Sequence, residues 1–132
     1  MSATRMVVHC IEVEDKPGSL YKLLSDIAEV GVDLHCLMAY SGVSGTGKVY
    51  LGAKDPSALQ ACAREAGLEA TEAAGFVLEG KDEVGAAAAA LKGLADAGIN
   101  GIAGAAMVCD SQYHMGIDVA AEDGDAAEEL LG

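Results

Sequence analysis

The most constraining feature of this sequence is a segment that occurs twice. Asp-x-x-Gly precedes a helical stretch at Asp15–Gly18 and again at Asp82–Gly85. The offset between these two turns also relates Gly31-Val32-Asp33 to Gly98-Ile99-Asn100, and it relates the apolar positions of the helices between them. The chain is therefore predicted to contain one supersecondary unit written twice.

Each repeat is short for an independent domain. The 132 residues divide into expected units at 1–70 and 71–132, near the lower size limit at which a chain buries its own core. Aromatic residues make up only 4% of the chain, so the core has to be built from aliphatic side chains. We expect each unit to depend on its neighbour or on a second chain.

Apolar periodicity predicts the order βαββα in the first repeat. The helices are expected to begin at Pro17 and at Asp55-Pro56, since proline suits the first turn and aspartate the N-cap, and to end at Gly31 and Gly67. The predicted elements cover, in order, residues 5–14, 17–31, 34–41, 49–54 and 55–67.

The second repeat follows the same order but lacks a last strand. Its predicted elements are one long or two short strands in 68–79, a helix over 84–97, a strand over 102–109, a loop around 110–114 and a strand from Ile117. From Ile117 onwards the offset grows by one, so Asp123-Gly124 corresponds to Asp55-Pro56 and starts a final helix. Either residues 68–79 serve both units, or a second chain completes the second sheet.

This element order is the ferredoxin-like pattern. We predict an α+β fold with two ferredoxin-like βαββα(β) units in tandem, antiparallel sheets and helices on one face. The strands carry apolar residues on both faces, so the helix-free face needs a cover, and we expect at least a dimer or a fused pseudo-dimer. Many functions share this fold, so it does not by itself assign one.

The net charge and the spacing of the cysteines limit the partners and the cellular compartment that we expect for this protein. A net charge of −13 disfavours nucleic acid and anionic membranes, which attract clustered cations. No apolar run approaches the ~20 residues of a membrane helix, and the N-terminus lacks the layout of a signal peptide. The four cysteines are widely spaced without a CxxC pair, as is typical of buried thiols in a reducing compartment. We expect a cytoplasmic protein.

The repeated segment resembles the ACT domain, a regulatory module that binds amino acids. The resemblance rests on Val13–Leu20 followed by a helix and Gly31–Leu34, with Glu79–Gly85 and Gly98–Asn100 as a more divergent copy. Over about residues 5–131 the chain is similar to stand-alone tandem ACT proteins. The resemblance implies a non-catalytic regulatory protein, a free amino acid bound at an interface between units, a homo-oligomer, and a partner enzyme or transporter.

The resemblance also implies which residues contact the ligand. They are Asp15, Lys16, Pro17, Gly18, Ser19, Leu20, Asp33, Asp82, Glu83, Val84, Gly85 and Asn100. Asp33 and Val84 replace the asparagine and proline usual in the family, so the two half-sites are unequal. The chemistry agrees, because glycine permits close backbone approach, a helix N-terminus attracts a carboxylate, and an aspartate accepts an ammonium.

The same residues also suit two other functions. The Asp-x-x-Gly turns also suit plain helix initiation, and a ligand-free structural or oligomerisation domain acting through protein–protein contacts is the main alternative. An unrecognised small enzyme is the third, although no catalytic set is readable and no cofactor is expected.

Two further patterns are weak as sites. Gly42–Lys48 nearly spells a P-loop, but Val49 occupies the magnesium-binding position, and a strand rather than a helix is expected to follow. In His9-Cys10 and His35-Cys36 the two side chains of each pair point to opposite faces of a strand, so neither pair chelates a metal. No metal is expected.

Overall fold

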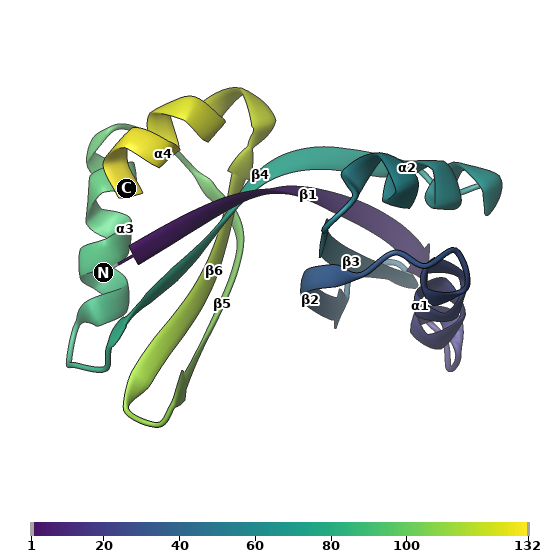
Figure 1. The fold of residues 1–132 in the computed structure, drawn as a ribbon, viewed down its shortest axis with the longest axis horizontal. Coiled ribbons are helices and arrows are strands. Elements are labelled where there is room, and N and C mark those ends of the chain that lie inside the picture. The colour runs from purple at the N-terminus through teal and green to yellow at the C-terminus, as the bar shows by residue number, and fades with distance from the viewer. Residues whose placement is uncertain (1, 132) are drawn as a thin grey trace. The chain divides into compact units, whose positions relative to one another are not determined.

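A computed structural model describes residues 2–131, and within them the chain forms six strands and four α-helices (Figure 1). The elements are, in order, β1 (Ser2–Glu14), α1 (Ser19–Glu29), β2 (Leu34–Ser41), β3 (Thr46–Ala53), α2 (Pro56–Glu65), β4 (Ala70–Lys81), α3 (Ala86–Asp96), β5 (Gly101–Cys109), β6 (Gln112–Ala120), the 3-10 helix η1 (Ala121–Asp123) and α4 (Gly124–Leu131). None of the helices between residues 2 and 131 is long and apolar enough to cross a membrane.

These elements form two compact units. The first unit is Val7–Glu72, and the second unit combines the described residues up to Met6 with those from Ala73 onwards. The boundary expected at residues 70/71 falls inside β4, and the residues before Val7, expected in the first unit, belong to the second. Both β1 and β4 therefore contribute residues to each unit.

The strand order explains how the second unit is completed. The hydrogen-bonded order is β2-β3-β1 in the first unit and β5-β6-β4 in the second, and β1 and β4 are neighbours. The start of β4 thus closes the first unit and its remainder opens the second, which is one of the two alternatives expected from the sequence. The fourth position of the second sheet is filled by residues 2–6 of β1, which the sequence pattern did not predict.

In the first unit, one face of the antiparallel sheet packs against α1 and α2. Ile11, Val49 and Leu51 point to this face, because alternate residues of a strand share a face. They contact apolar residues of the two helices, among them Ile27 and Leu59, and form a buried core.

The second unit repeats this arrangement with α3 and α4. Phe76 and Leu78 of β4 and Ile117 of β6 contact Leu94 and Ala127 of the helices. The predicted fold class is therefore confirmed.

One predicted loop is wrong. Residues 110–114 were expected to form a loop, but β6 begins at Gln112 and pairs with β5 from Cys109. Asp110 and Ser111 alone make the turn, with φ of 51° and 63°. Two successive residues with positive φ are the geometry of a two-residue hairpin whose twist matches the strands, so the chain reverses without a longer loop.

Candidate functional site

The turn that joins β1 to α1 has the backbone conformation that its glycine favours. Gly18 caps α1 with φ 91° and ψ −15°, in the left-handed region. A Cβ atom at Gly18 would meet no other atom within 4 Å, so the glycine is needed for its backbone angles rather than for space. Gly85 caps α3 in the same way, with φ 84°.

A cavity of about 200 Å³ lies beside this turn in the first unit. Its lining brings together four of the residues predicted for the ligand site, namely Asp15, Lys16, Ser19 and Leu20. The opposite wall comes from β2 and β3 and includes Tyr40, Ser41 and Lys48, which the sequence did not single out. Pro17 and Gly18 shape the turn but do not line the cavity.

Hydrogen bonds fix Asp15 in this cavity. Its carboxylate Oδ1 accepts a hydrogen bond from Ser41 Oγ at 3.0 Å, and its backbone N–H donates to the Gly45 carbonyl at 2.8 Å. The β2–β3 hairpin therefore holds the turn in place. The second oxygen of the Asp15 carboxylate remains an acceptor for a donor in the cavity.

Charges of both signs line the same cavity. Lys16 Nζ lies 2.7 Å from Glu14 Oε2, and this pairing raises the pKa of Lys16 and lowers the pKa of Glu14, chiefly through the hydrogen bond between them. Lys48 Nζ lies 3.6 Å from Glu12 Oε1. A zwitterionic ligand would find an anionic and a cationic partner here within one small volume.

Asp33 is placed differently from the turn residues. Its carboxylate accepts from Lys54 Nζ at 2.6 Å and from the Leu34 backbone N–H at 2.9 Å. These contacts lower the pKa of Asp33, with the Lys54 hydrogen bond as the largest cause. Asp33 does not line the cavity at the turn, and its contacts anchor the start of β2.

The second unit places its counterpart residues on an equivalent turn. Asp82 N–H donates to the Ser111 carbonyl at 2.9 Å, as Asp15 does to Gly45. The Glu83 carbonyl accepts from Ala86 N–H at 3.2 Å, while the Val84 side chain is fully exposed. Asn100 directly precedes β5.

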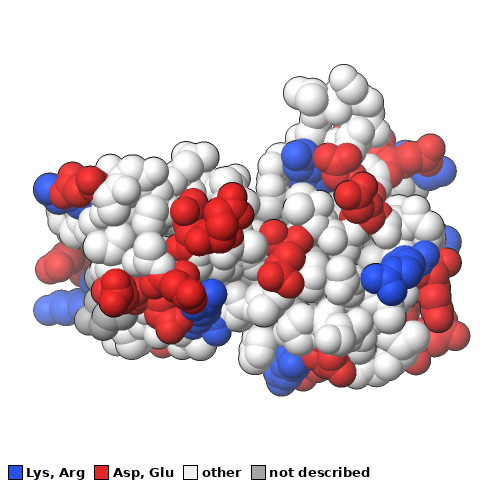
Figure 2. Space-filling view, turned by 90° about the horizontal axis from the view of Figure 1, so that it is seen from above, with Lys and Arg blue, Asp and Glu red and all other residues white. Residues whose placement is uncertain are grey.

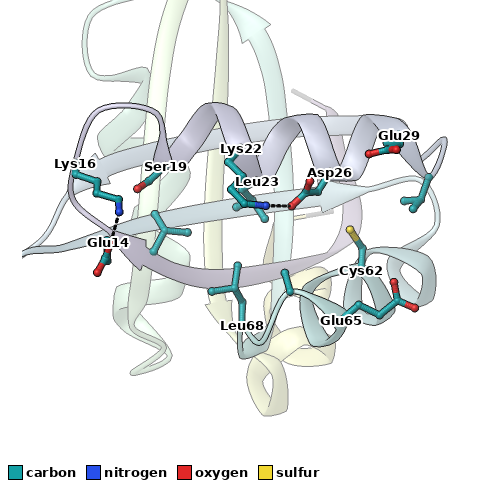
Figure 3. Close-up of a pocket in the computed structure, with 13 residues that line it drawn as sticks. Glu14, Lys16, Ser19, Lys22, Leu23, Asp26, Glu29, Cys62, Glu65 and Leu68 are labelled. Carbon is teal, nitrogen blue, oxygen red and sulfur yellow. Dashed lines mark hydrogen bonds and ion pairs between the residues drawn. The ribbon is translucent and has the colours of Figure 1, made fainter.

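A larger cavity of about 660 Å³ lies between α1 and α2 of the first unit (Figure 3). We call it the α1–α2 groove. It is lined by Val13, Glu14, Lys16, Ser19, Lys22, Leu23, Asp26, Glu29, Val30, Cys62, Glu65, Ala66 and Leu68. The spacing of Lys22, Asp26 and Glu29 puts them on one helix face, a pattern that is also typical of a solvated surface.

The His9-Cys10 pair behaves as the strand geometry requires. His9 pairs with Leu51 and is only 2% exposed, whereas Cys10 pairs with Tyr50 on the opposite face. Burial lowers the pKa of His9, so its imidazole is neutral at pH 7. Among residues 2–131, no three potential ligands are grouped as a metal site.

Acidic side chains form several separate patches among uncharged residues on the face shown in Figure 2, and lysines and arginines lie beside several of these patches. In the second unit, Arg5 Nη1 binds Asp125 at 2.8 Å and Glu128 at 3.0 Å and so joins the start of β1 to α4.

Several solved structures share this fold. Protein BT0572 from Bacteroides thetaiotaomicron superposes with a TM-score of 0.77 at 17% identity, over 98% of this chain and 88% of that chain. The ligand-free regulatory subunit of aspartate kinase from Thermus thermophilus gives 0.70 at 15% identity, over 98% and 93%. The corresponding subunit from Thermus flavus gives 0.64 at 19% identity, over 98% and 93%.

The chain has the fold of these regulatory subunits. Because the sequence identities are this low, the likeness concerns the fold alone. No protein-family model matches the sequence, and no curated protein matches it. The resemblance to ACT domains is thus supported at the level of the fold.

Proposed function

We propose that this protein is a non-catalytic regulatory protein that binds a free amino acid at the turn between β1 and α1. The observation that carries the proposal is the cavity in which Asp15, Lys16, Ser19 and Leu20 meet the β2–β3 hairpin. The left-handed Gly18 directs the start of α1 at this point.

The groups at the turn match the two ends of an amino acid. The N-terminus of α1 favours a carboxylate, because the backbone N–H groups of its first turn and the helix dipole attract negative charge. The Lys16 ammonium, which pairs with Glu14, lies in the same lining and would have to share its charge with the ligand. Asp15 is the natural partner of the ligand ammonium, since one of its carboxylate oxygens is already oriented by Ser41. A cavity of about 200 Å³ suits a small amino acid.

The solved structures with this fold support a regulatory role. Two of them are regulatory subunits of aspartate kinase. By analogy, we propose that this protein acts on a partner enzyme or transporter, as a homo-oligomer. None of the four cysteines forms a disulfide, which favours a cytoplasmic setting.

A second candidate function is an interaction domain that needs no ligand. It is favoured by β5, an edge strand with no charged residue on which Ile102, Met107 and Val108 are exposed. An apolar edge strand pairs readily with another chain.

A thermal-shift screen of the twenty amino acids separates these two candidates. If the turn is a regulatory site, one or a few amino acids raise the melting temperature, because a ligand that binds only the folded state stabilises it. If no amino acid shifts the transition while light scattering still shows a specific oligomer, the interaction domain replaces the regulatory site.

A further inference from the structure

The α1–α2 groove differs from the equivalent region of the second unit. When the two repeats are aligned, Gly93 takes the place of Asp26, and Leu130 takes the place of Cys62. A Cβ atom at Gly93 would lie 3.9 Å from the Leu130 Cβ, so α3 and α4 come together at this point. The first unit instead has an acid and a thiol facing an open volume of about 660 Å³.

The groove has an apolar floor and an excess of negative charge. Val13, Leu23 and Leu68 supply much of the apolar surface. Both lysines of the lining already have a carboxylate partner: Lys16 lies 2.7 Å from Glu14, and Lys22 lies 3.0 Å from Asp26 (Figure 3).

Two further carboxylates of the lining, Glu29 and Glu65, form no ion pair within residues 2–131. Figure 3 shows them on α1 and α2, at the end of the groove away from Lys16. This end of the groove is therefore anionic without a cation of its own, which favours a positively charged ligand.

Cys62 supplies a second and independent observation. Its side chain is 8% exposed, lines the groove and points towards α1 (Figure 3). Among the described residues its thiol has no hydrogen-bond partner. Burial raises the pKa of Cys62, and the charges of Asp26 and Glu65 raise it further, so the field of these carboxylates reaches the interior of the groove. The thiol stays protonated, and its sulfur is a weak acceptor for an N–H group.

We propose that the α1–α2 groove binds a primary alkylamine, with its ammonium between Glu29 and Glu65 and its alkyl chain on the apolar floor. An ammonium donates three hydrogen bonds, which suits carboxylates from two helices. A quaternary amine would be recognised by aromatic rings, and no aromatic residue lines the groove. An anion would be repelled by the carboxylates of Glu29 and Glu65, which form no ion pair within residues 2–131.

This site is separate from the proposed amino-acid site, although Val13, Glu14, Lys16 and Ser19 line both cavities. The proposed alkylamine site depends on Glu29, Glu65 and Cys62, which line only the larger cavity. Substitutions at these residues therefore test the groove without removing the aspartate that the amino-acid site requires.

The first experiment titrates the full chain with pentylamine, 1-pentanol and pentanoate, three probes with the same chain and different head groups. Calorimetry at low salt should show saturable binding of pentylamine alone. Pentylamine should also slow the alkylation of Cys62 by iodoacetamide, followed by peptide mass spectrometry, because the bound chain covers the thiol. Equal binding of 1-pentanol would overturn the proposal, since the carboxylates would then have no role.

The second experiment uses matched variants. Glu65→Gln and Glu29→Gln should each weaken pentylamine binding by about tenfold, the lower end of the scale of one charge-assisted hydrogen bond, because both carboxylates are exposed. Glu69→Gln removes the same charge from an exposed position outside the groove and should leave binding unchanged. Cys62→Leu copies the second unit and should abolish binding by filling the groove.

Each result decides the proposal. Unchanged affinity in both Glu65→Gln and Glu29→Gln overturns it, whatever Cys62→Leu does to folding. Asp15→Asn, which changes only the smaller cavity, should leave pentylamine binding intact. A protein that binds pentylamine but no amino acid would therefore refute the proposed function and leave this inference standing, and the reverse result would do the opposite.

Discussion

The two units of this protein share the backbone conformation of their turns, but they differ in the side chains of the helices that follow. Both turns carry a left-handed glycine, Gly18 or Gly85, and both donate an aspartate N–H to a hairpin carbonyl. The helices that follow are different. α1 carries Lys22, Asp26 and Glu29, whereas α3 begins with five consecutive alanines.

Positions that are alike in both units are those that folding requires, whereas other positions differ between the two copies. Core positions keep apolar side chains in both units, such as Ile27 and Leu94, which are equivalent when the repeats are aligned. Of the charged residues that α1 contributes to the groove, Lys22 and Asp26 are replaced by Ala89 and Gly93 in the second copy, whereas Asp96 stands at the position of Glu29. A residue type that folding does not require in the second unit is a candidate for binding in the first.

The largest expected effect tests whether the two cores are equivalent. Ile27 is 1% exposed and Leu94 is 2% exposed, at matching positions of their units. Replacement of either by alanine should lower the free energy of unfolding by about 2–5 kcal/mol through lost burial and the cavity left behind. Urea denaturation of both variants measures this. A cost outside this range in one variant only would show that the two cores are not equivalent at these positions.

The next prediction concerns the two aspartates at the turns. Asp15→Asn should weaken binding of an amino acid found by the screen by roughly 1.5–3 kcal/mol, because it removes the charge that receives the ligand ammonium. Asp82→Asn is the matched control and should change affinity only if the second turn also binds. Calorimetry measures both. Unchanged affinity in both variants would mean that the aspartates serve the turns alone.

Local chemistry made much of the fold predictable. Gly31, Gly67 and Gly98 were expected to end helices, and each has a positive φ. Asp55 was expected to cap α2, and its carboxylate accepts a hydrogen bond from Ala58 N–H at 3.1 Å. These features depend on residues a few positions apart, and a sequence displays them directly.

The sequence did not predict which residues distant along the chain lie next to one another in the fold. Ser2, Ala3 and Thr4 show no strand alternation, and only pairing with β4, which is distant along the chain, makes them part of the second sheet. The α1–α2 groove was missed for the same reason. Its acids look like an ordinary solvated helix face until Glu65 and Cys62 of α2 are placed opposite them.

A smaller effect is expected from the two capping glycines. Gly18→Val and Gly85→Val should each cost about 2 kcal/mol of folding free energy, because a β-branched residue is strained at positive φ even where its side chain has space. Thermal unfolding compares them. We expect similar costs in stability, with loss of amino-acid binding only in Gly18→Val. A wild-type affinity in Gly18→Val would remove the turn from the site.

The smallest effect concerns the helix-free faces, where the units differ again. Tyr50 of the first unit stacks on Tyr40 with ring centroids 6.3 Å apart, and in the second unit Asp118 takes the place of Tyr50. Burial raises the pKa of Asp118 from 3.8 to about 6. The folded state therefore binds a proton that the unfolded state releases, and the free energy of unfolding falls as pH rises from about 3.8 to about 6.

Asp118→Asn should remove this pH-dependent fall in the free energy of unfolding. At pH 7 the variant should be more stable than the parent by about 1 kcal/mol, a value discounted for the partial exposure of the carboxylate. At pH 3.5, where the parent carboxyl is largely protonated in both states, the two proteins should differ little. Urea denaturation at both pH values measures the difference. A variant that is less stable at pH 7 would show that the ionised carboxylate has a favourable partner, and that an acid is needed on this face where the first unit has a tyrosine.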